Sequence, residues 1–281
     1  MSIRRLAKRS RKKKPQRANP AAPKVRAIRR PDPSEGAMSI QHYILTIEPP
    51  DSSRYQMCAQ TFADAGMAAN FVQGIRGVTP EAQALRAPLH ERLFYKYPLT
   101  DGEVACTFGH WRILRAFLGT TGAVCAIFED DVMLPDPARL QTLYDKALTD
   151  PSPPWDILRL HDLYPSKAAG TMRWQGEELT RYHVPPAGSA AYLVTRQGAE
   201  KILARRYIFR PYDTDIAHCW ELGLRVRCVV PNPVQTRPDD QLASSLETAR
   251  DRMRRQKSLL RSIKGEVHGL YAKAAGRLLS R

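Results

Sequence analysis

Hydrophobic positions along the chain alternate between strand and helix periodicity across the middle of the sequence. Helical spacing at Arg54–Ala65 and at Gln197–Arg206 separates short β-rich or continuous apolar runs. This alternation is typical of an α/β domain with a largely parallel sheet. The runs predict strands at Tyr43–Ile47, Ala123–Phe128, Trp155–Leu160, Ser189–Val194 and Val226–Val230.

The clearest helix start lies at Thr100. The segment Thr100–Glu103 matches a capping box, with Thr100 as the N-cap and Glu103 three residues later. Apolar residues of the following helix cover an arc wider than a surface helix needs, which predicts a helix packed between two elements. His110 lies within this arc, where a hydrogen-bonded core histidine is the favoured interpretation. Cys106, one turn earlier, also permits a metal-binding pair, which we rank lower.

Three carboxylates follow the most apolar run of the chain. Ala123–Phe128 is typical of a central strand buried on both faces, and Glu129, Asp130 and Asp131 stand at its carboxyl end. Ligands of open α/β sheets bind outside the carboxyl ends of strands. Adjacent carboxylates repel one another unless a cation offsets their charge, and such oxygen ligands suit Mg²⁺ or Mn²⁺ shared with phosphate. A solvated acidic turn is the alternative, because Pro135 shows that the chain bends here.

Further carboxylates stand near other predicted element ends. Asp213 and Asp215 lie where a helical stretch begins, and capping of that helix is the commoner role for aspartates there. A catalytic role for one of them is the alternative. Asp162 follows the predicted strand Trp155–Leu160, and its role, like that of the adjacent His161, stays open.

The charge of the chain is concentrated at its two ends. The sequence has 44 Lys+Arg and 28 Asp+Glu, a net charge of +16. Residues 1–30 carry basic residues and no acidic ones, and residues 250–281 are also strongly basic, whereas residues 31–249 are mildly acidic. We therefore expect a disordered basic tail at 1–37, one α/β domain at 38–249 and a basic helical extension at 250–281.

Several functional classes are disfavoured by the sequence. It lacks P-loop, dinucleotide-binding, HExxH and GxSxG motifs. No apolar run is long enough to span a membrane, no secretory signal is evident, and the five cysteines form no CxxC pair, so we expect a reducing, cytoplasmic location. The basic ends suggest peripheral contact with the anionic inner face of a membrane. The alternative interpretation is a non-catalytic module that binds nucleic acid or an anionic membrane through these basic ends.

Four segments, taken in order, resemble glycosyltransferase family 25, the lipooligosaccharide galactosyltransferases and their relatives. The resemblance covers most of residues 41–247 and neither end of the chain. Ala105 and Gly109 depart from the Gly and Ser usual at these positions. The matching segments are Leu99–Cys106 with His110, Ile127–Val132, Ala187–Val194 with Gly198–Lys201, and Pro231–Ser245.

The resemblance implies a GT-A type, Rossmann-like domain that moves a sugar, with galactose expected, from a UDP-sugar to a saccharide or lipid-linked saccharide with inversion. Asp131 and Glu129 would bind Mn²⁺ or Mg²⁺ against the diphosphate, with Asp130 as an alternative partner for Asp131. Asp213 or Asp215 would be the base. Glu129 and Asp130 belong to this expected donor site, and His110 would shape it. Arg54 would contact the nucleotide, with a surface salt bridge as the equal alternative. Nucleic acid is then an unexpected partner, because the basic residues lie outside the folded domain.

Overall fold

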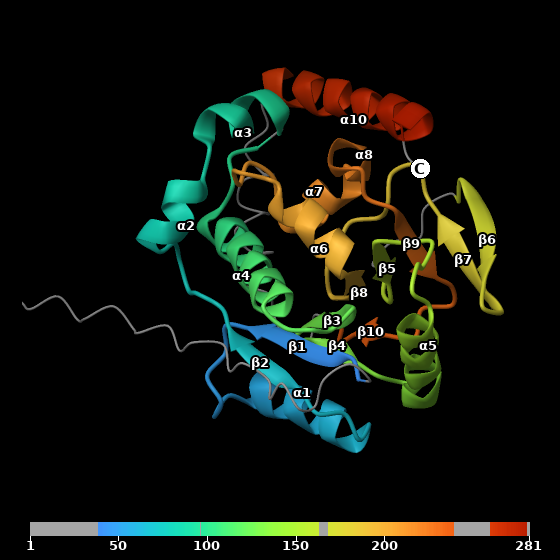
Figure 1. Cartoon of the computed structure of the whole chain (residues 1–281). Coiled ribbons are helices and arrows are strands. Elements are labelled where there is room, and N and C mark those ends of the chain that lie inside the picture. Colours follow the sequence, from blue (N-terminus) through green and yellow to red (C-terminus); the bar gives the residue numbers. More distant parts are fainter. Residues whose placement is uncertain (1–38, 96, 163–167, 239–258, 280–281) are drawn as a thin grey trace, which may run out of the picture.

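The computed structural model describes residues 39–95, 97–162, 168–238 and 259–279. Within these residues the protein is an eight-stranded sheet covered by helices on both faces (Figure 1). This arrangement confirms the predicted α/β, Rossmann-like fold. The expected basic tail, 1–37, lies outside the described residues.

Six of the eight strands point in one direction, and β7 and β8 run antiparallel to their neighbours. A separate pair joins β4 (Val132–Met133) to β10 (Gln235–Thr236). The order across the large sheet is β2 (Asn70–Gln73), β1 (Gln41–Thr46), β3 (Val124–Glu129), β8 (Ala191–Thr195), β5 (Ile157–Arg159), β9 (Val226–Val229), β7 (Glu177–Arg181) and β6 (Gly170–Trp174).

Two apolar layers hold the helices to the sheet. One layer contains buried residues of α1 (Ser53–Asp64) and α5 (Pro137–Thr149). The opposite layer contains those of α4, α6 and α7, and smaller helices cover its edge. The remaining helices of the described residues are α2 (Pro80–Leu85), α3 (Pro88–Phe94), α4 (Asp101–Leu118), α6 (Arg196–Leu203), α7 (Tyr212–Ala217), α8 (Cys219–Leu222) and α10 (Leu259–Leu279).

Helix α4 begins as the sequence predicts. Thr100 caps it, and Glu103 returns the capping interaction to the backbone N–H of Thr100 at 2.8 Å. The wide apolar arc is buried because α4 packs closely on β1. A Cβ atom added to Gly109 would lie 2.8 Å from the Leu45 Cδ1 atom, so glycine permits this approach. The close packing brings Cys106 and His110 over the end of the central strand.

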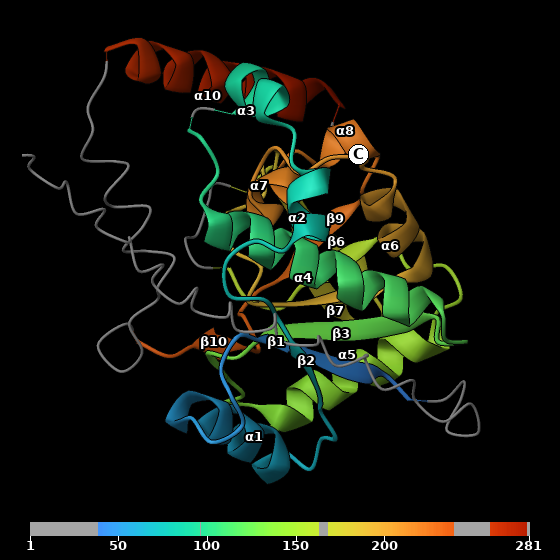
Figure 2. The same ribbon diagram turned by 90° about the vertical axis from the view of Figure 1, so that its left-hand side faces the viewer.

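Helix α10 crosses one end of the molecule beside α3 and α8 (Figure 2). The Tyr271 ring meets the Trp220 ring edge-on, with centroids 6.5 Å apart. Near the end of α10, a Cβ atom at Gly276 would overlap the backbone carbonyl of His183, so glycine is needed for this contact. No helix in the described part of the chain has the length and apolar character needed to cross a membrane.

Candidate functional site

The candidate site lies at the carboxyl end of β3, between β1 and β8. Strand β3 is buried along its length, because helices cover both faces of the sheet. Glu129 ends the strand opposite Leu45 of β1, and its backbone N–H donates to the Ala190 carbonyl at 2.8 Å. Asp130 and Asp131 form the turn that follows. The predicted carboxylate cluster therefore lies at the carboxyl end of β3, but its three members have different hydrogen-bond partners.

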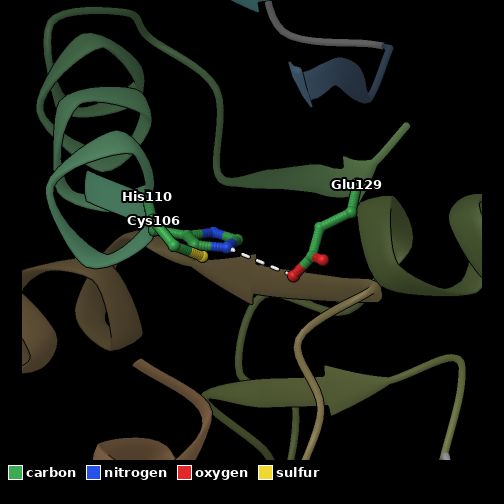
Figure 3. A group of neighbouring side chains, drawn as sticks. All are labelled: Cys106, His110 and Glu129. Carbon is green, nitrogen blue, oxygen red and sulfur yellow. Dashed lines mark ion pairs between the residues drawn. The ribbon is translucent and has the colours of Figure 1, made fainter. Parts of the chain in front are cut away.

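Glu129 is held on the α4 side of the site. The Ser189 hydroxyl donates to its Oε1 atom at 2.6 Å, and His110 Nε2 lies 3.6 Å from the same oxygen (Figure 3). Burial acts to raise the pKa of Glu129, but His110 and Ser189 outweigh it and hold the pKa below its usual value. The side chain is therefore a carboxylate at neutral pH.

His110 joins three elements beneath Glu129. The side chain is fully buried, its Nδ1 atom lies 3.0 Å from the Tyr192 hydroxyl, and its ring stacks on that of Tyr212 with centroids 4.1 Å apart. The two tyrosine hydroxyls are 2.8 Å apart. A hydrogen-bonded buried histidine is thus present, and it also contacts the site. The sequence analysis did not identify either tyrosine, because each also suits an ordinary apolar core.

Asp130 is bound by neighbouring side chains on the other side of the strand end. The Thr46 hydroxyl donates to Oδ2, and Arg54 Nε donates to Oδ1 at 2.6 Å. Burial raises the pKa of Asp130, although Thr46 and Arg54 act against it. Arg54 also reaches Asp131, with 3.7 Å between its Nη2 atom and Oδ2. The structure therefore places Arg54 at the site, paired with the carboxylates themselves.

Asp131 is the least satisfied of the three carboxylates. Its Oδ1 atom is buried and has no hydrogen-bond partner among the described residues. Burial and then the charge of Glu129 raise the pKa of Asp131 to about 7, and Arg54 offsets this only in part. A hard divalent cation would satisfy such an oxygen, so the donor chemistry fits Mg²⁺ or Mn²⁺. The backbone is fixed here, because Arg237 N–H donates to the Asp131 carbonyl at 2.8 Å.

The two aspartates near α7 have different surroundings. Asp213 Oδ2 accepts from the Gly188 N–H at 3.1 Å, and Oδ1 accepts from the Thr214 N–H at 2.7 Å. Asp215 forms a bidentate ion pair with Arg205, with N–O distances of 3.0 and 2.8 Å. Arg205 also binds Glu221, so Asp215 belongs to an ion-pair cluster. The geometry leaves Asp213 as the aspartate of this pair that is connected to the strand-end loop.

That loop, residues 187–189, connects the two sides of the site. Gly188 binds Asp213 and has a φ of 108°, while the next residue, Ser189, binds Glu129. A side chain at this φ would be strained, so glycine shapes the loop. Buried Arg159 supports it by donating to the Gly188 carbonyl at 2.7 Å. The sequence analysis missed Ser189 and Arg159. The sequence feature that could have indicated Arg159 is Asp162, a carboxylate near the same strand end, which pairs with Arg159 at 2.7 Å.

A cavity of about 930 Å³ lies elsewhere, between α3, α6, α8 and α10. Aromatic residues such as Phe209 and Tyr271 line it together with basic ones, among them Arg205, which binds Asp215. None of the strand-end carboxylates lines this cavity. The strand-end cluster at β3 is kept as the candidate site, because a buried carboxylate oxygen without a hydrogen-bond partner among the described residues lies there.

Comparison with models of protein families gives a match. The model of glycosyltransferase family 25, described as an LPS biosynthesis protein, matches residues 40–217. No curated protein matches the chain. The matched range contains β3, its three carboxylates, the 187–189 loop and Asp213.

Proposed function

Since the chain belongs to glycosyltransferase family 25, we propose a specific reaction for it. Membership of this family indicates a glycosyltransferase of lipopolysaccharide biosynthesis. In the proposed reaction, a hexose, with galactose as the expected sugar, moves from a UDP-sugar to a hydroxyl of a saccharide acceptor with inversion. The supporting observation is the buried, unpartnered Oδ1 atom of Asp131 at the carboxyl end of β3, beside ionised Glu129.

Asp131 and Glu129 are the proposed ligands of the divalent cation. Ser189 and His110 both approach Glu129 through Oε1, so Oε2 is the oxygen proposed to face the cation. Mn²⁺ or Mg²⁺ bound there would neutralise charge that builds on the departing diphosphate. Asp130 orients Arg54, whose guanidinium stands beside the same carboxylates and supplies positive charge where the nucleotide is proposed to lie.

Asp213 is the proposed base. In an inverting displacement the acceptor hydroxyl attacks the face opposite the leaving group, and a carboxylate must take its proton. Gly188 and Thr214 hold the Asp213 carboxylate in one orientation, and the 187–189 loop fixes it relative to Glu129. The proposed roles require the two carboxylates to stand far enough apart to admit the reacting groups between them, by analogy with two-carboxylate sugar chemistry.

The test of this reaction is UDP release from a panel of UDP-hexoses, measured with a saccharide acceptor. We expect one sugar to dominate, with turnover that is lost on chelation and restored by Mn²⁺ or Mg²⁺. Release of UDP without an acceptor reports hydrolysis and serves as the background. Turnover that does not change on chelation would contradict the cation proposal. Absence of UDP release with every UDP-hexose would contradict the proposal that the donor is a UDP-sugar.

We propose that α3 and α10 provide contact with an anionic membrane surface. Leu93 on α3 and Val267 and Leu270 on α10 are exposed, and the Lys264 side chain bonds α10 to the Arg92 carbonyl of α3. The sequence of residues 250–281 is strongly basic, and basic residues near an anionic surface contribute about 1 kcal/mol each. We expect the protein to sediment with anionic vesicles and less with zwitterionic ones, and Leu270→Asn to weaken this binding. Equal binding to both vesicle types would contradict the proposal.

A further inference from the structure

Three side chains beside the site offer sulfur, nitrogen and oxygen ligands to a common point. Cys106 and His110 extend from successive turns of α4 toward Glu129 at the end of β3 (Figure 3). One potential ligand atom from each residue lies within 4.8 Å of the other two. We propose that Cys106, His110 and Glu129 bind a borderline-soft divalent cation of the Zn²⁺ class. This site is additional to the proposed Mn²⁺ or Mg²⁺ position at Asp131.

His110 offers a buried ring nitrogen to a cation. Its Nε2 atom is buried and has no hydrogen-bond partner among the described residues. When Nδ1–H donates to the Tyr192 hydroxyl at 3.0 Å, Nε2 carries a lone pair. That lone pair faces the Glu129 carboxylate at 3.6 Å, too far for a hydrogen bond. Positive charge is needed between this nitrogen and the carboxylate: in the metal-free protein a proton on Nε2 supplies it in the ion pair with Glu129, and a cation can take the place of that proton.

The separation also matches two ligands of one metal ion. Nitrogen and oxygen ligands lie about 2.0–2.2 Å from Zn²⁺, so two of them on a tetrahedral ion are about 3.4 Å apart. The 3.6 Å between His110 Nε2 and Glu129 Oε1 is close to this value. Three protein ligands leave a fourth position open.

Neighbouring groups already orient two of the ligands. Tyr192 contacts the far nitrogen of His110, and Ser189 donates to Glu129, which is the outer support that metal-binding histidines and carboxylates usually have. A thiolate and an imidazole favour Zn²⁺ over Mn²⁺ or Mg²⁺, whereas Asp131 offers only oxygen. Binding would release the Cys106 thiol proton and fasten α4 to the end of β3. The two proposed cation positions therefore differ in ligand chemistry.

Cobalt(II) is the probe, used with the full chain in the absence of any nucleotide sugar. We expect a thiolate-to-cobalt charge-transfer band that saturates at one ion per chain and disappears when Zn²⁺ is added. The band should be lost in Cys106→Ser. It should persist in Cys228→Ala, which alters another cysteine on β9, and in Asp131→Asn, which alters the other cation position. Absence of the band in wild type, or its persistence in Cys106→Ser, would overturn the proposal.

A second measurement needs only wild-type protein and so does not depend on the folding of a variant. Cys106 is partly exposed, whereas the other four cysteines are buried. We expect Zn²⁺ to protect Cys106 from alkylation, as located by peptide mass spectrometry. Alkylation at the same rate with and without Zn²⁺ would overturn the site. Neither readout involves sugar transfer, so a failure here is distinct from a failure of the proposed function.

Discussion

Asp131→Asn is expected to lower sugar transfer by about 10³-fold at saturating acceptor. The variant keeps the shape of the side chain but loses the charge proposed to hold the cation, and such charge stabilisation is worth several kcal/mol in the transition state. UDP release measured at several Mn²⁺ concentrations checks this. Asp64→Asn on α1, which alters an exposed carboxylate, is the matched control and should retain activity.

The same variant should not lose stability. The pKa of Asp131 is about 7 in the folded protein, whereas an unfolded aspartate has a pKa of about 4. The free energy of unfolding contributed by this group therefore falls as pH rises between these values. At pH 8, without added metal, Asp131→Asn should unfold at the same temperature as wild type or a higher one. Loss of both activity and thermal stability would contradict a role in cation binding.

Asp213→Asn is expected to lower kcat by about 10²- to 10⁴-fold while leaving UDP affinity unchanged. The amide cannot accept the proton of the acceptor hydroxyl, and removing a general base has an effect of this size. Steady-state turnover and UDP binding, measured on the same preparation, separate the two quantities. The single amide oxygen can accept from only one of the Gly188 and Thr214 N–H groups, so thermal unfolding of the same preparation must show that the variant stays folded.

Asp215→Asn is the matched control for this prediction. It weakens the charged hydrogen bonds with Arg205 and Arg210, so we expect a loss of about 2 kcal/mol in stability and near-normal turnover. Thermal unfolding and kcat measured together show the difference. If Asp215→Asn lost turnover and Asp213→Asn kept it, the assignment of the base would be reversed.

Those elements with strong local signals could be predicted from the sequence. The capping box at Thr100 and the doubly buried strand β3 appear in the structure where the pattern places them. The β6–β7 hairpin was missed because β6 is largely exposed and has little apolar periodicity. Its two-residue turn, Gln175–Gly176, has positive φ at both positions, and glutamine is an uncommon signal for such a turn.

The candidate site was only partly predictable for a similar reason. The position of three carboxylates after β3 follows from the apolar run before them. The different partners of the three carboxylates do not follow from it. Thr46 and Arg54, which bind Asp130, and Ser189, which binds Glu129, come from three other segments of the chain. Likewise, helical spacing pairs Cys106 with His110, but only the packing of α4 on the sheet brings them to Glu129. Tertiary contacts thus supply what local patterns lack.

The anomeric configuration of the product tests the central claim most directly. UDP-hexoses such as UDP-galactose carry an α-linked sugar, so a single displacement assisted by Asp213 must give a β-linkage. Proton NMR of the product formed by the wild-type chain, read from the anomeric coupling constant, distinguishes the two outcomes. The account predicts a β-linked hexose, and an α-linked product would contradict it.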